Sequence, residues 1–406
     1  MSRVRIIGGG LTGILAAFEA HRLGVRDIVL EDALDRLGGW SLPRVSHGLE
    51  LRDGAFAFGP AHDPIRQALE WHGVAFEEVD LHFGAINPSL NGPRASWGEG
   101  PVLAAGVMSL VANQTPLSIN DILRTYPRAA ADPLAQYCQW RLGVWLDQVH
   151  ASAAPALGLD QVRLTPVGEA PPVNVSTPRR GAVPRDGLNG LFASASRALA
   201  RLGVEIRLHS LVSPREAAMT CKADELVVWA ADPLPLFDLT GGRGQRPRMI
   251  GERVASYVFR ARLEAPLPLT VRNFTGEGKV SAVRVYQSRG ETLVSVECVE
   301  ETGDEALRAE VLRLLSPFAR RPMILDACVL TSMRTRFACP SVEAVQKLAR
   351  LEADLHQAHQ GSFIVAGWES TDLAARFSAL AERMAQRLEA SGSVAAPAAG
   401  PVAAVA

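Results

Sequence analysis

Residues 4–17 read V-R-I-I-G-G-G-L-T-G-I-L-A-A, and the rest of the chain can be arranged around this stretch. The four residues before the glycines are mostly β-branched, which is typical of a short strand. After the glycines, apolar residues recur at helical spacing as far as Leu23. The stretch therefore predicts a strand, a tight glycine turn and a helix.

The glycines have the spacing of a dinucleotide-binding turn. Gly8, Gly10 and Gly13 fit G-x-G-x-x-G, in which the first permits the turn, the second admits a pyrophosphate and the third allows close helix packing. The N–H groups at the start of the helix, at Leu11 and Thr12, are suited to phosphate binding. Glycines at this spacing also occur by chance in ordinary turns. The flanking sequence therefore decides whether the motif indicates dinucleotide binding.

A second apolar strand, residues 27–30, ends in an acid. Glu31 follows Gly13 at close to the roughly 20 positions expected of a carboxylate that binds a ribose hydroxyl. An acid at this place disfavours the 2′-phosphate of NADP. The alternative is a solvated carboxylate at the end of a strand.

The run D-R-L-G-G at residues 35–39 extends the pattern to a known family. Together with G-G-G-L-T-G and Glu31 it resembles the N-terminal signature of FAD enzymes such as amine oxidases, protoporphyrinogen oxidases, phytoene desaturases and UDP-galactopyranose mutases. The resemblance implies FAD as the cofactor, with Arg36, Gly38 and Gly39 in contact with it.

Two departures from this signature affect the expected cofactor contacts. The gap before Gly38 is one residue longer than usual, so Asp32 can share the ribose role with Glu31. Trp40 stands beside the cofactor where many amine oxidases carry arginine.

Two later stretches are similar to the remaining FAD-binding segments of this family. Residues 184–212 read as loop, helix and strand, and the resemblance implies that Val212 contacts the adenine. A buried strand is predicted at residues 224–230. Near the C-terminus, residues 361–372 predict a strand and a turn before a helix over 373–389, and Gly367, Thr371 and Asp372 are implied to face the flavin ring.

The resulting fold class is α/β with two domains. A Rossmann-type FAD-binding domain with a parallel sheet takes three discontinuous segments, residues 1–80, 185–245 and 345–390. A substrate domain of mixed sheet and helices takes residues 81–184 and 246–344. Residues 391–406 are small, contain Pro and Gly breakers, and predict a disordered tail.

Residues 246–328 are rich in strand signals, and the resemblance implies that this sheet covers the flavin. Arg284, Tyr286 and Glu297 are candidates for substrate contact. Alternatively, they lie on the solvent-exposed face of a strand, the wet face. Lys279 is the lysine that lies where amine oxidases use one, with a solvated turn as the alternative.

Other residues of the substrate segments have two interpretations each. A predicted helix over residues 132–150 carries Trp140 and Trp145, which pack in a core or line the substrate site. Arg334 and Arg336 bind an anionic substrate or are surface charges. Asp53 and Gly54 lie near the flavin or in an ordinary turn; His82 and His150 have no base or nucleophile near them in sequence.

The composition excludes several classes of protein. The 406 residues carry 42 basic and 43 acidic side chains, so no net field attracts nucleic acid or an anionic membrane. No stretch approaches the ~20 apolar residues of a membrane span. Five scattered cysteines without metal-binding spacing are typical of reduced, mostly buried thiols in a cytoplasmic protein. We expect a small-molecule substrate and no metal.

The leading hypothesis is an FAD-dependent oxidoreductase that removes a hydride from a C–N or C–C bond of a small biosynthetic intermediate. In such enzymes the cofactor performs the redox chemistry, and the protein binds and orients the substrate. One alternative is a mutase-like flavoenzyme that acts on a nucleotide sugar without net oxidation. Another is a flavin-binding partner protein without catalytic activity.

Overall fold

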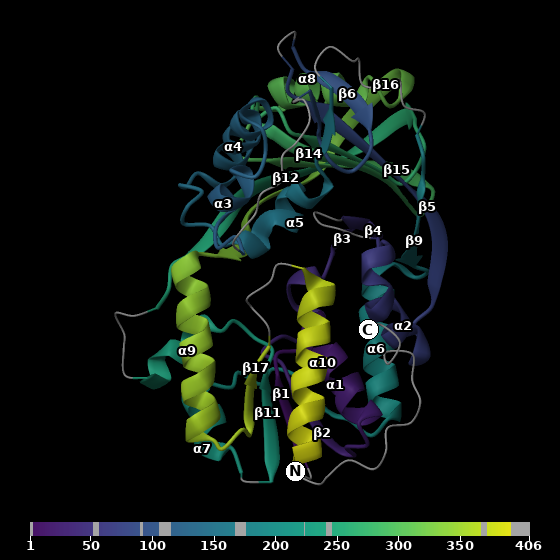
Figure 1. The fold of residues 1–406 in the computed structure, drawn as a ribbon. Helices are drawn as coiled ribbons and strands as arrows, with labels where there is room; N and C mark the ends of the chain where they lie inside the picture. Colours follow the sequence, from purple (N-terminus) through teal and green to yellow (C-terminus); the bar gives the residue numbers. More distant parts are fainter. Residues whose placement is uncertain are drawn as a thin grey trace.

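Two sheets, one parallel and one mixed, face each other in the computed structural model (Figure 1). The structure describes residues 3–51, 57–89, 92–104, 115–166, 176–222, 224–240, 246–366 and 372–390. The predicted tail, residues 391–406, lies outside this part of the chain.

The first sheet is parallel and has five strands. Their order is β10 (Glu205–Arg207), β2 (Asp27–Glu31), β1 (Arg3–Ile7), β11 (Glu225–Trp229) and β17 (Phe363–Val365). The strands come from three separated stretches of the chain, which confirms the predicted α/β class. Apart from the edge strand β10, they are short and mostly apolar because both faces of the sheet are covered.

Helices cover each face of the parallel sheet. One core contains Ile6, Ile28 and Leu30, together with side chains of α1 (Leu11–Arg22), α2 (Asp63–Trp71), α6 (Gly187–Arg201) and α10 (Leu373–Ala390). The opposite core contains Ile7, Val227 and Trp229, with α7 (Pro214–Thr220), η5 (Leu234–Thr240) and α9 (Val342–Ala358). The two cores follow from the alternation of side chains along each strand.

The second sheet is mixed, as predicted, and has eight strands. Its order is β16 (Arg320–Pro340), β12 (Met249–Glu264), β15 (Glu291–Cys298), β14 (Val280–Ser288), β13 (Leu269–Asn273), β5 (Phe76–Asn87) and β6 (Arg94–Trp97), and β9 (Arg179–Pro184) also pairs with β5. Only β13 and β5 among the paired strands named here run parallel to each other. Its outer face is apolar and packs against α8 (Asp304–Leu315).

The inner face of the eight-stranded sheet, which is turned toward the parallel sheet, is covered in two places. At one end lie α3 (Ile119–Leu123), α4 (Arg128–Leu142) and α5 (Ala154–Leu157). At the other end lies the hairpin of β3 (Arg44–Ser46) and β4 (Leu49–Leu51), which packs on Tyr286 and Leu293. The smaller elements are η1 (Gly39–Ser41), η2 (Pro60–His62), β7 (Val102–Ala104), η3 (Ala151–Ala153), η4 (Leu159–Gln161) and β8 (Arg163–Thr165).

Two predicted elements are wrong in length. The helix expected over residues 132–150 ends at Leu142, because Gly143 adopts the left-handed conformation with φ 64°. Trp145 consequently lies outside the helix and is 69% exposed, so it is not a core residue. The strand expected through residue 212 is limited to β10, after which the chain turns at His209 (φ 54°).

The cysteines agree with the prediction of reduced thiols. None of the five is part of a disulfide in the structure, and Cys138, Cys298 and Cys339 are buried. Burial raises the pKa of the Cys138 and Cys298 thiols to about 12, so both stay protonated. Within the described residues, none of the helices has the length and apolar character needed to cross a bilayer.

Candidate active site at the junction of the two sheets

The candidate site lies where the parallel strands end. The N-terminus marks the far end of the parallel sheet in Figure 1, so the carboxyl ends of its strands are directed at the inner face of the eight-stranded sheet. Ligands of open α/β sheets bind at this edge. The helices that follow the strands also present their N-termini there.

The first glycine turn has the geometry that its motif predicts. Gly8 has φ 108°, and an added Cβ would lie 2.8 Å from the backbone of Ala230 on the neighbouring strand. An added Cβ on Gly13 would collide with the carbonyl oxygen of Gly8. By contrast, a Cβ on Gly10 would meet nothing within 4 Å, and Gly10 is the N-cap of α1 without a side-chain cap. Open space in front of uncapped N–H groups suits a pyrophosphate.

The second glycine pair packs directly on the first turn. The Gly38 N–H donates to the Gly9 carbonyl oxygen at 2.8 Å, and Gly10 and Gly38 form a parallel bridge. Gly39 (φ 54°) lies so close that an added Cβ would be 3.2 Å from Cα of Gly10. Arg36 is exposed beside this junction, and the Trp40 side chain lies outside the described residues.

The two acids after β2 are both engaged by the protein. Glu31 is 3% exposed, so it is not the solvated carboxylate of the alternative; it accepts from Nε of Arg5 at 2.5 Å and lies 3.5 Å from the Arg207 guanidinium. Asp32 accepts from the backbone N–H of Gly9 at 2.5 Å. Asp32 therefore supports the glycine turn, and Glu31 forms a buried ion pair close to the predicted ribose position.

The other predicted cofactor residues have different surroundings. Val212 is buried in the core on the α7 and α9 side of the parallel sheet. The Asp372 carboxylate accepts the Ala375 N–H at 2.8 Å and so caps the N-terminus of α10. Gly367, Thr371, Asp53 and Gly54 lie outside the described residues.

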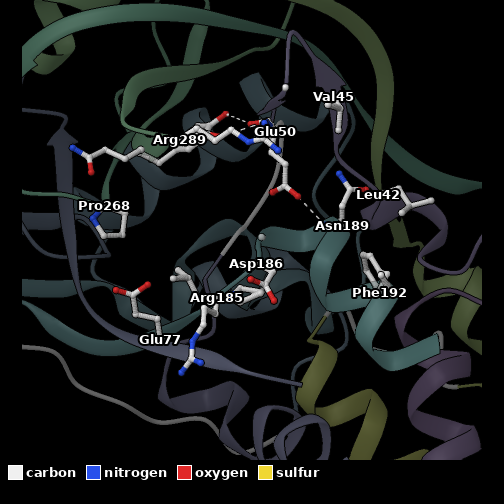
Figure 2. Close-up of a pocket in the computed structure, with 18 of the residues that line it drawn as sticks. Leu42, Val45, Glu50, Glu77, Arg185, Asp186, Asn189, Phe192, Pro268 and Arg289 are labelled. Carbon is white, nitrogen blue, oxygen red and sulfur yellow. Dashed lines mark hydrogen bonds between the residues drawn. The ribbon is translucent and has the colours of Figure 1, made fainter. Parts of the chain in front are cut away.

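A cavity of about 1070 Å³ opens between the two halves of the protein. Figure 2 shows its walls, which come from the β3–β4 hairpin, β5, the start of α6, and the ends of β13 and β14. Arg36 and Leu37 of the cofactor signature also line it. The charged and polar lining includes Glu50, Glu77, Arg185, Asp186, Asn189 and Arg289.

Glu50 connects three of the elements that line this cavity, the hairpin, α6 and β14. Its carboxylate accepts the backbone N–H groups of Leu188 (3.1 Å) and Asn189 (2.8 Å), at the first turn of α6 (Figure 2). The Tyr286 hydroxyl donates to the Glu50 carbonyl oxygen at 3.3 Å. A carboxylate at a helix N-terminus is stabilised by the helix dipole, so Glu50 fixes the hairpin against α6.

The strand residues proposed for substrate contact are buried rather than wet. Arg284 and Glu297 are 9% and 2% exposed and form an ion pair across β14 and β15, and Tyr286 is 2% exposed. The wet-face alternative is therefore wrong for these three residues. Lys279 lies in an exposed turn, where its ammonium pairs with Glu300 at 2.6 Å, away from the cavity.

Among the described residues, the remaining candidates do not come together as a catalytic group. Nδ1 of His82 contacts the Ser176 hydroxyl at 2.7 Å, and His150 binds Ser152; burial lowers the pKa of both histidines. Nε1 of Trp140 donates to the Gly278 carbonyl oxygen at 3.1 Å, and its ring packs on the α4 core. The side chains of Arg334 and Arg336 lie outside the described residues.

Several lining residues were not predicted from the sequence. Glu50, Arg185, Asp186 and Arg289 belong to turns or strand ends, where charged residues are common for reasons unrelated to function. The only available signal was the D-G-L-N-G loop at residues 186–190, which was assigned to the cofactor segment as a whole.

These features define a protein with a dinucleotide-binding half and a second sheet that closes over it. A family model described as an NAD(P)-binding Rossmann-like domain matches residues 6–70. Two curated relatives are both tryptophan 2-monooxygenases. The Pseudomonas savastanoi protein is 33% identical over 24% of this chain, and the Pantoea agglomerans pv. gypsophilae protein is 48% identical over 30%. The matches span 19% and 26% of those relatives.

Solved structures match almost the whole chain. They include reduced UDP-galactopyranose mutase (TM-score 0.64, 12% identity, 98% of each chain) and a putrescine oxidase variant (0.56, 14%, 96% and 99%). A third is a putative protoporphyrinogen oxidase from an Exiguobacterium species (0.52, 15%, 96% and 99%). At these identities the likeness concerns the fold. The fold implied by the resemblance in the sequence is thus confirmed.

Proposed function

We propose that the protein is an FAD-dependent oxidoreductase of the amine oxidase-like type. The observation that carries this proposal is the pair of interlocked glycine turns, with open space at Gly10 in front of the uncapped N-terminus of α1. An NAD(P)-type domain does not require the second pair, Gly38 and Gly39. We also propose that the FAD-binding domain has the boundaries predicted from the sequence.

The described residues fit parts of FAD. The N-terminus of α1 would bind the pyrophosphate, and the exposed Arg36 guanidinium would neutralise its charge. The N-terminus of α10, capped by Asp372, would face the flavin ring and would stabilise negative charge on it. When bound, FAD accepts a hydride from the substrate. The protein would bind FAD and orient the substrate in the cavity below the eight-stranded sheet.

A C–N bond is the substrate bond that the relatives support. Tryptophan, which gives the two curated relatives their name, is an α-amino acid, and putrescine is a diamine. Both present a C–N bond to a flavoenzyme. We therefore place the oxidation of a C–N bond ahead of a C–C bond.

The mutase-like alternative is favoured by one observation, the likeness to UDP-galactopyranose mutase over 98% of the chain. Such an enzyme acts on a nucleotide sugar and requires no electron acceptor. The two activities differ in whether oxygen or another acceptor is consumed.

The first experiment is an absorption spectrum of the purified protein. A flavin spectrum with bands near those of free FAD is expected, and a colourless protein that takes up no added FAD would refute the proposal. Peroxide release with a panel of amines and L-amino acids then tests the oxidase. Conversion of a nucleotide sugar by the dithionite-reduced protein alone would establish the mutase.

Replacement of Gly10 by valine tests the cofactor site directly. The Cβ of the new side chain would meet nothing within 4 Å in the unbound protein and would lie in the open space in front of α1. We expect FAD content to fall at least tenfold with little change in folding. Gly24→Ala is the matched control, because Gly24 also has open space around an added Cβ but lies at the other end of α1, although its positive φ of 90° adds some strain. Unchanged FAD content in Gly10→Val would contradict the assignment.

A further inference from the structure

The inner face of the eight-stranded sheet changes character along its length. It is apolar under α4, at Phe274 and Ile250, and apolar again at Tyr286 and Leu293 under the hairpin. Between these two ends the face is polar. The polar part consists of Arg272, Arg284, Glu297, Ser256 and Ser295.

The strand register places these side chains next to one another. Arg284 is directly opposite Ser295 on β15 and opposite Thr270 on β13. Arg272 is two residues beyond Thr270, so the two arginines occupy diagonal positions on the same face. Like charges at neighbouring positions of a sheet repel each other, and this cost is larger inside the protein than at its surface.

The two arginines differ in their partners. Arg284 forms its ion pair with Glu297. For the Arg272 guanidinium, the described part of the chain provides neither an ion pair nor a hydrogen bond, although the side chain retains partial exposure. Burial lowers the pKa of Arg272; Tyr137 opposes this shift, and the charges of Arg141 and Arg284 add to it. Glu99, the nearby acid, is paired with Arg179.

The Arg272 guanidinium is packed against neighbouring groups. An added Cβ on Gly158 would lie 3.1 Å from its Nη1 atom, so the guanidinium rests against this turn. Arg141 lies beside it and donates to the Tyr137 hydroxyl at 2.8 Å. The hydroxyls of Ser256 and Ser295, both fully buried, have no hydrogen-bond partner within the described residues. Within the described residues, this face therefore carries a guanidinium without a counter-charge and two hydroxyls without a hydrogen-bond partner.

We propose that this polar part of the inner face, with Arg272 at its centre and Arg284 and Ser295 beside it, binds an oxyanion group of the substrate. The inference deepens the proposed function and rests on it. The group is a carboxylate, as in an amino acid, or a pyrophosphate, as in a nucleotide sugar, because a guanidinium binds both through paired N–H donors. A substrate that carries only ammonium groups, such as a diamine, is repelled at this face.

The test uses the purified protein with benzoate, benzylamine and UDP as probes. Thermal shift and the change in flavin absorbance measure binding without turnover. We expect an anion to bind and benzylamine not to bind. Saturation by benzoate assigns the site to a carboxylate, and saturation by UDP alone assigns it to a pyrophosphate. Binding of neither anion, or equal binding of benzylamine, would overturn the inference.

Variants at Arg272 then locate the site. Arg272→Met should weaken anion binding by roughly 30-fold or more, the usual loss when a buried charged partner is truncated. Arg272→Lys, which keeps the charge but not the planar fork, should retain part of the affinity even if Arg272→Met fails to fold. Arg262→Met is the matched control, because Arg262 is exposed on the same sheet and pairs with Asp326. Unchanged affinity in both Arg272 variants would refute the site.

Turnover separates this inference from the proposed function. For an L-amino acid, Arg272→Lys should raise KM more than it lowers kcat, while the corresponding decarboxylated amine keeps its KM. An equal KM of wild type and variant for the L-amino acid refutes the anion site and leaves the oxidoreductase intact. Anion binding through Arg272 in a protein without flavin supports the site and refutes the oxidoreductase.

Discussion

The two faces of the eight-stranded sheet differ although they are formed by the same strands. The outer face, with Phe259, Val283 and Val296, is wholly apolar and packs on α8. The inner face carries Arg284 and Glu297 among fully buried hydroxyls. The outer face provides stability through burial of apolar area, whereas the inner face retains charges that cost stability, which is typical of a functional surface.

The largest effect is expected on the outer face. Phe259→Ala removes a fully buried ring that also contacts the Arg308 guanidinium, and should lower the free energy of unfolding by about 3–5 kcal/mol. The measurement is chemical denaturation followed by tryptophan fluorescence. Ile324→Ala, at an exposed position of the same sheet, is the control and should change stability by less than about 0.5 kcal/mol. Similar losses in both variants would contradict the assignment of the core.

A smaller loss is expected when the inner ion pair is broken. Glu297→Gln removes the carboxylate charge that faces Arg284 and should cost about 3 kcal/mol, since a buried guanidinium loses its counter-charge. The same denaturation experiment measures it. Arg320→Gln, which breaks an exposed pair with Glu264, should cost less than about 1 kcal/mol. Equal effects of the two substitutions would show that the inner pair is not buried.

The parallel-sheet half should respond to acid through His72. Its ring stacks on Phe18 with centroids 4.0 Å apart, and burial together with the His21 charge lowers its pKa from 6.5 to about 4. Below pH 6.5 the unfolded chain binds a proton that the folded protein does not. The free energy of unfolding therefore falls between pH 6.5 and 4, by about 1–2 kcal/mol after allowance for partial exposure.

Denaturation at pH 7.5 and pH 5 measures this loss. His72→Phe should keep the stacking on Phe18 and remove this part of the pH dependence. The histidines of the second half, His82 and His150, remain in both proteins and serve as an internal reference. An unchanged pH dependence in His72→Phe would contradict the assignment.

The smallest effect is expected at an unpaired hydroxyl of the inner face. Ser256→Ala removes a buried group that has no hydrogen-bond partner in the described structure, so stability should stay constant or rise by up to about 1 kcal/mol. Denaturation of wild type and variant in parallel measures this change. A loss of more than about 1 kcal/mol would show that the hydroxyl binds ordered water.

The cofactor half could be predicted from the sequence to a large extent. The glycine spacing at Gly8, Gly10 and Gly13 is a local signal, because each glycine is required by its own backbone geometry or by a contact a few residues away. The start of α10 at Leu373 followed from the same strand, turn and helix pattern. The end of α4 was missed because Gly143 interrupts an apolar pattern that continues beyond it.

The sequence alone determined that the chain begins with a dinucleotide-binding turn and builds a parallel sheet from separated stretches. Only the tertiary structure decided which strand residues of the second half are buried. Arg284 and Glu297 alternate with valines in the same way on a wet strand and on a covered one, so the pattern does not distinguish the two. Covering of the inner face by the hairpin and α4 makes the ion pair internal, and strand register brings Arg272 beside it.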